Sequence, residues 1–179
     1  MTRRAPPSPL AAPPLVVHLK RGRDGSATLS CARADGSVTW QRSDGARARY
    51  FPRHDLTHLA VESELGMRHA FYGLVADGWD LADFGTPWPR GPLPPEAEAV
   101  ERIVGLLDTA RARGSTWTAA ELAAELAHAR AAHGLAFTPP AITDEALARI
   151  HRRMHELFAQ WDAVPPGEAL ELPFAPGAR

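Results

Sequence analysis

The start of the chain alternates between apolar and polar residues with the two-residue period of a β-strand. Three such segments, residues 15–21, 26–33 and 37–42, are separated by Asp24-Gly25 and Asp35-Gly36. An Asp-Gly dipeptide between alternating segments is the strongest short-range signal for a hairpin. The pattern therefore predicts a three-stranded antiparallel meander.

The same alternation predicts which strand residues face the core. Along the second strand Leu29 and Cys31 share one side, and along the third strand Val38 and Trp40 do. The polar residues between them are expected on the opposite, solvated face, and they are Thr28, Ser30 and Thr39. One face of the meander is thus expected to be buried in the core.

Residues 46–51 are predicted as a fourth strand that leads into Pro52. Proline suits the first position of a helix, because its missing N–H would have no partner there. We therefore expect a helix over about residues 52–65, ended by Gly66, and a second helix over about residues 69–76.

Three further helices follow an irregular, Gly- and Pro-rich connection over residues 79–94. The first is predicted over about residues 95–113, with acids in its first turn and arginines in its last, as the helix dipole favours. The second begins with a capping box formed by Thr118 and Glu121, and the third has Thr143 as its N-cap. The buried face of the third helix is predicted to hold Leu147, Ile150, Met154, Leu157, Phe158 and Trp161.

The alternation of residues 170–174 predicts a last short strand, and Pro173 restricts that strand to the edge of a sheet. Together the elements predict an α+β fold. An N-terminal antiparallel β-meander of three to four strands packs on a bundle of about five helices, with a C-terminal edge strand. Residues 15–179 are expected to form this single domain. Residues 1–14, rich in Pro and Ala, are expected to be a disordered tail.

Composition narrows the classes to which the protein can belong. Apolar residues make up 45% and charged residues 23% of the chain, and no apolar run is long enough to cross a membrane, so we expect a soluble protein. Basic and acidic residues number 20 and 21, and without a net field nucleic acid is not expected as a partner. Cys31 is the single cysteine, and the Pro-rich start lacks the apolar core of a secretion signal. Both features favour a reducing, cytoplasmic location.

Most residues able to carry chemistry lie between Phe51 and Phe84. On a helix, His54, His58 and Glu62 follow one another at four-residue steps and form one slanted line on a single face. Two neutral imidazoles, a carboxylate and a water are a common set of ligands in catalytic zinc sites. The spacing therefore predicts that these three residues bind zinc or another divalent metal.

Other polar residues of the stretch form a second tier of candidates. Asp55 lies close to the metal-binding face and is predicted to be catalytic, by orienting a ligand or accepting a proton. His69, on the following segment, is a further candidate metal ligand. Thr57 points to the opposite side of the helix, which we expect to be exposed. A second His-x-x-x-His pair, His151 and His155, has no acid at the next turn and is interpreted as structural.

The stretch also resembles known sequences. FPRHDLTHLAVE, followed by AFYGLVADGWD, is similar to a family of uncharacterised bacterial proteins that share an HDLTH-x-x-VE core. His54-Asp55-x-x-His58 also resembles the HDxxH zinc motif of membrane-associated proteins that support ubiquinone biosynthesis. In those proteins a glutamate follows after eleven intervening residues, where this chain has Ala70 directly after His69. The resemblance implies metal binding, with His69 as a replacement ligand.

Two functions remain open from the sequence. The first is a metal-dependent enzyme that hydrolyses a small molecule, with zinc held by His54, His58 and Glu62 and with Asp55 assisting. The second is a non-catalytic structural or protein-interaction domain, in which the histidines are buried hydrogen-bonding groups. In that case the Pro-rich tail and the hairpin edge are expected to contact a protein partner.

Overall fold

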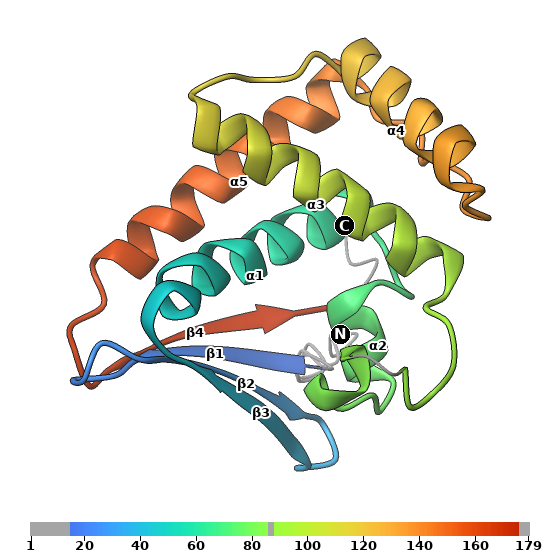
Figure 1. Cartoon of the computed structure of the whole chain (residues 1–179). Helices are drawn as coiled ribbons and strands as arrows, with labels where there is room; N and C mark the ends of the chain where they lie inside the picture. The colour runs from blue at the N-terminus through green and yellow to red at the C-terminus, as the bar shows by residue number, and fades with distance from the viewer. Residues whose placement is uncertain (1–14, 86–87, 176–179) are drawn as a thin grey trace, which may run out of the picture.

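The computed structural model describes residues 15–85 and 88–175 (Figure 1). The predicted tail of residues 1–14 lies outside these residues. The described chain forms one four-stranded sheet, five α-helices and a short 3₁₀-helix, η1. In chain order the elements are β1 (Leu15–Arg21), β2 (Ala27–Arg33), β3 (Val38–Ser43), α1 (Gly45–Leu65), α2 (Phe71–Ala76), η1 (Leu81–Phe84), α3 (Pro95–Arg113), α4 (Ala119–His133), α5 (Asp144–Asp162) and β4 (Ala169–Phe174).

The four strands form an antiparallel sheet in the order β3-β2-β1-β4. The registers of β1 with its two neighbours place Val17 opposite both Cys31 and Leu172. Residues paired in this way share one face of the sheet, and all three are buried. The predicted meander and the predicted C-terminal edge strand are therefore confirmed, and the strand that carries Pro173 lies at the edge.

The predicted assignment of faces on β3 is wrong. Thr39 lies opposite Cys31 and is 7% exposed, whereas Val38 and Trp40 are 57% and 65% exposed. The sheet register decides this, because Thr39 must share the face of Cys31. Its hydroxyl is satisfied in the interior, where it accepts a hydrogen bond of 2.9 Å from the backbone N–H of Leu81.

Helix α1 begins earlier than the sequence pattern predicts. It starts at Gly45, so residues 46–51 are helical and not a fourth strand, and Pro52 lies inside the helix and not at its first position. Gly45 turns the chain out of β3 with a φ of 57°, a left-handed value that glycine adopts without strain. The Ala and Arg residues that follow are strong helix formers, which outweighs their weak alternation. Gly66 ends α1 as predicted.

Helix α1 lies between two layers. The sheet covers one side of it, and α3 and α5 pack against the other, with α4 further out (Figure 1). The helix is therefore buried around most of its circumference, and Thr57, predicted to be exposed, is fully buried. The Thr57 hydroxyl donates a hydrogen bond of 2.8 Å to the carbonyl oxygen of Arg53. The sheet packs on helices as predicted, and α1 forms the middle layer.

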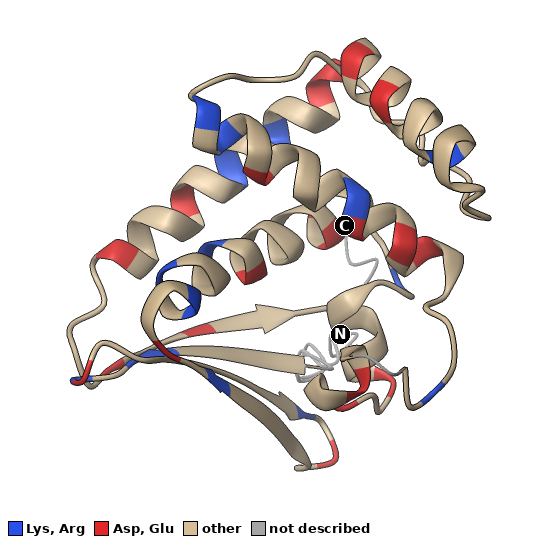
Figure 2. Cartoon of the chain, in the orientation of Figure 1, with Lys and Arg blue, Asp and Glu red and all other residues tan. Residues whose placement is uncertain are grey.

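Helix α2 begins at Phe71, slightly later than the predicted start at about residue 69, and the ends of the later helices agree with the sequence signals. Thr118 and Glu121 form the predicted capping box, and Thr143 caps α5. Acids occupy the first turn of α3 and arginines its last turn (Figure 2). On α5 the predicted stripe is buried except for the half-buried Phe158. Among the described residues no helix combines the length and the apolar character needed to span a membrane.

Gly73 allows α2 to dock closely on the segment before it. A Cβ atom at this position would lie 2.1 Å from the backbone carbonyl oxygen of Arg68. We predict that Gly73→Ala destabilises the protein by about 1–3 kcal/mol, the usual cost of forcing atoms into a packed site. Denaturant or thermal unfolding measures this change.

Gly105→Ala is the matched control for this prediction. Gly105 lies on the exposed side of α3, and apart from its own helix backbone and chain neighbours no described atom lies within 4 Å of a Cβ placed there. Alanine is the better helix former, so this variant should be stabilised by about 1 kcal/mol. Equal stabilities for the two variants would contradict the role given to Gly73.

Candidate metal centre

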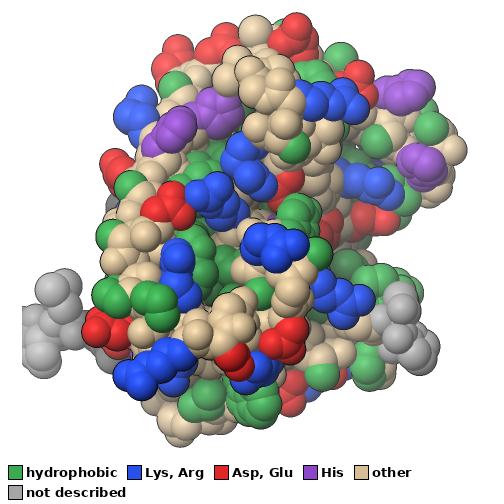
Figure 3. Space-filling model, turned by 60° about the vertical axis from the view of Figure 1, so that its left-hand side comes forward, with side chains coloured by type: hydrophobic (Ala, Val, Ile, Leu, Met, Phe, Trp, Pro, Cys, Tyr) green, Lys and Arg blue, Asp and Glu red, His purple; other side chains and the backbone are tan. Residues whose placement is uncertain are grey.

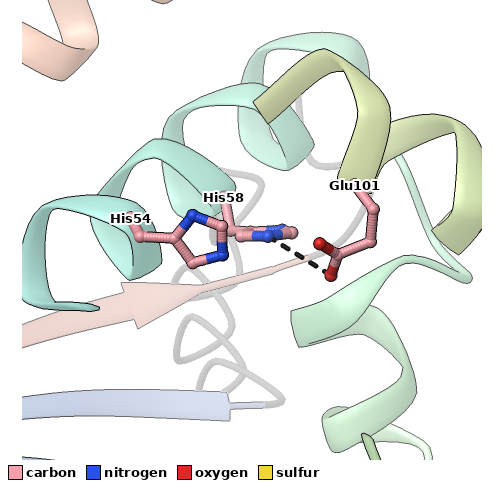
Figure 4. Close-up of side chains that lie close together, drawn as sticks. All are labelled: His54, His58 and Glu101. Carbon is pink, nitrogen blue, oxygen red and sulfur yellow. Dashed lines mark ion pairs between the residues drawn. The ribbon is translucent and has the colours of Figure 1, made fainter. Parts of the chain in front are cut away.

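Three potential metal ligands from two helices meet beside α1. His54 and His58 lie about one turn apart on α1, and Glu101 faces them from α3 (Figure 4). One ligand atom from each residue lies within 4.8 Å of the other two. The two imidazole rings meet edge to face, with centroids 4.9 Å apart. These three residues are therefore close enough to hold a metal ion.

The ring of His54 is oriented by a carboxylate behind it. Its Nδ1 donates a hydrogen bond of 2.9 Å to Asp108 Oδ2, and the Tyr50 hydroxyl donates to the same oxygen at 3.1 Å. Burial alone would raise the pKa of Asp108, but hydrogen bonds from His54 and Arg111 hold it below its ordinary value. Nε2 of His54 is left to face His58 and Glu101 (Figure 4).

His58 lies between two carboxylates. Its Nδ1 is 3.4 Å from Glu62 Oε1, and its Nε2 is 3.4 Å from Glu101 Oε1. Both distances are longer than a good hydrogen bond, and Nδ1 has no hydrogen-bond partner in the described chain. Burial would lower the pKa of His58, but the two carboxylates outweigh it and raise the pKa to about 10. In the absence of a metal, a proton bound to His58 therefore supplies the positive charge of the site.

Glu62, the predicted third ligand, lies on the Nδ1 side of His58. Its side chain is fully buried, and its carboxylate accepts hydrogen bonds from the backbone N–H groups of Tyr72 at 2.9 Å and Gly73 at 3.2 Å. These donors belong to the first turn of α2, where N–H groups lack partners within the helix. Glu62 does not belong to the group formed by His58, His54 and Glu101. Its role as a ligand stays a prediction.

Asp55, the predicted catalytic residue, lines the same cleft as the three ligands. This cleft has a volume of about 370 Å³ and is bordered by α1, α2, β3, η1 and α3. Asp55 is 4% exposed, and its carboxylate accepts no hydrogen bond from the described residues. Burial raises its pKa to about 7. A carboxyl group in this state at the wall of a cleft is suited to exchange protons near neutral pH.

His69 lies apart from the histidine pair of α1. It belongs to the linker between α1 and α2, its side chain is 63% exposed, and its Nδ1 is 3.7 Å from Asp77 Oδ2. The linker is held by Glu96, whose Oε1 accepts the backbone N–H groups of Arg68 and His69, each at 2.6 Å. The described geometry does not bring His69 into the three-residue group, and its ligand role stays a prediction.

Spacing along α1 cannot reveal Glu101 and Asp108, because they lie on another helix. A signal for both nevertheless exists in the sequence of α3. Its buried positions include Ala97 and Val104, and Glu101 and Asp108 continue the same line at steps of three and four residues. An acid on a buried helix face needs a partner. The pattern indicates that a partner exists, and only the packing of α3 on α1 identifies it.

The second histidine pair lies on another face of the molecule. His151 and His155 line a cavity of about 650 Å³ together with Arg53 and Arg111, and Figure 3 shows arginine and histidine side chains gathered on this face. Burial, followed by the charge of His155, lowers the pKa of His151. In the described part of the chain, the pair does not belong to a group of three metal-ligating residues.

Comparisons with models of protein families, with curated proteins and with solved structures find no match to this chain. The resemblance to the HDxxH zinc motif therefore stays a prediction from its residues. His54 and His58 occupy the two histidine positions of that motif. Ala70, at the position of its glutamate, is buried at the start of α2. The carboxylate that joins both histidines in a possible group of metal ligands, among the described residues, is that of Glu101 from α3.

We predict that Asp55→Asn raises the stability of the metal-free protein. The Asp55 pKa is about 7 in the folded state against an ordinary value of 3.8, so the ionised carboxylate destabilises the fold at high pH. Stability is recovered as the pH falls through 7 toward the ordinary value. Thermal unfolding with a chelator present should show the variant above wild type at about pH 8 and a smaller gap at about pH 5. The same gap at both pH values, or a less stable variant, would contradict this account.

Proposed function

We propose that this protein is a metal-dependent hydrolase of a small molecule, with zinc or another divalent metal held by His54, His58 and Glu101. The observation that supports this most is the convergence of the three ligand atoms within 4.8 Å. All three residues line one cleft, so a small molecule can reach an ion held there. Three protein ligands leave a position for water, as in catalytic zinc sites.

The charges around the histidines favour a cation. Asp55, Glu62 and Glu101 have no Lys or Arg partner among the described residues, and they share the two imidazoles. A buried carboxylate without a counter-charge destabilises the fold. A divalent cation beside the imidazoles compensates these carboxylates more fully than the single proton on His58 does.

Both histidines have the support that metal ligands typically receive. Nδ1 of each ring faces a carboxylate, which belongs to Asp108 for His54 and to Glu62 for His58. Carboxylate–histidine pairs of this kind fix the ring orientation and leave Nε2 free for the metal. Glu62 thus contributes to the proposed site without binding the ion itself.

The chemistry follows from the ligand set. A divalent metal supplies a bound water of lowered pKa as a nucleophile and polarises the bond to be hydrolysed. Asp55 lines the same cleft and is the proposed acceptor of a proton from that water. Two histidines and a carboxylate also bind iron(II) in oxygenases, so identifying the metal also tests the reaction class.

A second candidate is a non-catalytic domain in which His54 and His58 are structural. The raised pKa of His58, about 10, favours it, because a protonated imidazole between two carboxylates forms a buried ion pair without a metal. Such a domain would act through a protein partner. Val38 and Trp40, exposed on the edge strand β3, provide an apolar surface for one.

Elemental analysis of protein purified without a metal-affinity tag separates the two candidates. For the hydrolase we expect about one equivalent of zinc or another divalent metal per chain. His54→Ala, His58→Ala and Glu101→Gln should each lose the metal, because each removes one of three protein ligands. Competition with a chromophoric chelator measures the affinity that remains.

His155→Ala is the matched control. His155 belongs to the other His-x-x-x-His pair, on α5, and lies outside the three-residue group. This variant should keep the metal content of wild type. A wild-type protein that takes up no metal on reconstitution, with His58→Ala merely less stable, would support the second candidate.

Glu62→Gln and Asp108→Asn test the supporting carboxylates. If these residues orient the imidazoles, each variant should still bind one metal ion, with an affinity reduced about 10–100-fold. Complete loss of the metal in Glu62→Gln, as in Glu101→Gln, would make Glu62 a ligand, as its spacing on α1 predicts. Unchanged affinity in both variants would show that neither carboxylate supports the site.

A further inference from the structure

An arginine shares the face of α1 that carries the histidines. Arg47 lies seven residues before His54, close to two full turns, so the two side chains project from nearly the same side of the helix. Phe51 lies between them, and all three residues line the cleft. A rise of about 1.5 Å per residue puts the Cα atoms of Arg47 and His54 about 10 Å apart.

Arg47 is not engaged with another part of the described chain. Its side chain is exposed, and its guanidinium makes no hydrogen bond or ion pair with the described residues. Arg42, which lines the same cleft, is by contrast held by Asp24 at 2.7 Å and Asp44 at 3.1 Å. Arg47 therefore brings an uncompensated positive charge to the cleft.

Opposite charges line different parts of the cleft. The acids Asp55 and Glu101 lie with the histidines, whereas Arg47 lies near the start of α1, close to the end of β3. A metal ion would offset the acids, and nothing described offsets the arginine. The apolar part of the lining is mostly aromatic, with Phe51, Phe71 and Phe84 beside Leu81 and Ala82.

We propose that the substrate carries an anionic group, a carboxylate or a phosphate, which Arg47 binds while the reacting group contacts the metal. This inference rests on the proposed metal-dependent function. A guanidinium binds both kinds of anion through paired N–H donors. The aromatic side chains contact the apolar segment that joins the two ends of the substrate, and the cleft volume of about 370 Å³ limits the substrate to a small molecule.

Straight-chain dicarboxylates test this on the zinc-loaded protein. One carboxylate binds the metal, and the second reaches Arg47 only when the chain is long enough. By titration calorimetry we expect suberate to bind about tenfold more tightly than octanoate, the monocarboxylate of equal length. Succinate is too short to reach Arg47, so it should bind no more tightly than butyrate. The ω-phosphono analogue of suberate distinguishes the anions, since tighter binding favours a phosphate and weaker binding a carboxylate.

Two variants complete the experiment. Arg47→Ala should abolish the preference for suberate and leave the zinc content unchanged. Arg49→Ala should keep the preference, because Arg49 is also exposed on α1 but lines a different cavity.

Three outcomes would overturn the proposal. A wild-type protein that binds zinc but shows no preference for suberate would overturn the proposal about Arg47. The metal-dependent function would be unaffected by that result. Equal loss of the preference in both arginine variants would indicate a general effect of charge and would have the same consequence. A wild-type protein that binds neither zinc nor another divalent metal would overturn both the proposal and the metal-dependent function.

Discussion

Helix α1 is enclosed on most sides, so the polar side chains that it carries depend on partners from other elements. Water cannot satisfy groups in such a position, and an unpaired buried polar group destabilises a fold by about 1–3 kcal/mol. Asp55, Thr57, His58 and Glu62 are all buried on this one helix. Thr57 is satisfied within α1 by the carbonyl oxygen of Arg53, whereas Glu62 and His58 face groups of α2 and α3.

Helices α2 and α3 supply partners for Glu62 and His54, and these partners lie around the candidate site. The first-turn amides of α2 hold Glu62, which faces His58. From α3, Asp108 holds His54, and Arg111 in turn holds Asp108. The contacts that dock α2 and α3 are therefore also the contacts that orient the two imidazoles.

Asp55 and Arg47 are the other charged groups that matter for the chemistry of the cleft. Asp55 is the one buried carboxylate of α1 that accepts no hydrogen bond from the described residues, and it lies at the cleft wall next to both histidines. A group kept in this costly state beside potential metal ligands is typical of a functional site. With Arg47 on the same helix face, the cleft combines the three candidate metal ligands, a buried carboxyl group and an exposed arginine.

Local signals in the sequence determined much of the fold and two of the three candidate metal ligands. Some signals act within a few residues, namely the Asp-Gly turns, the capping residues Thr118 and Thr143, and the helix stop at Gly66. The strands and helices that begin or end at these residues could therefore be predicted. The four-residue step from His54 to His58 is local in the same sense. Only the tertiary structure decided the inward face of β3, the full burial of α1 and the approach of Glu101. Those features depend on register and helix packing between segments far apart in the chain, which no local pattern records.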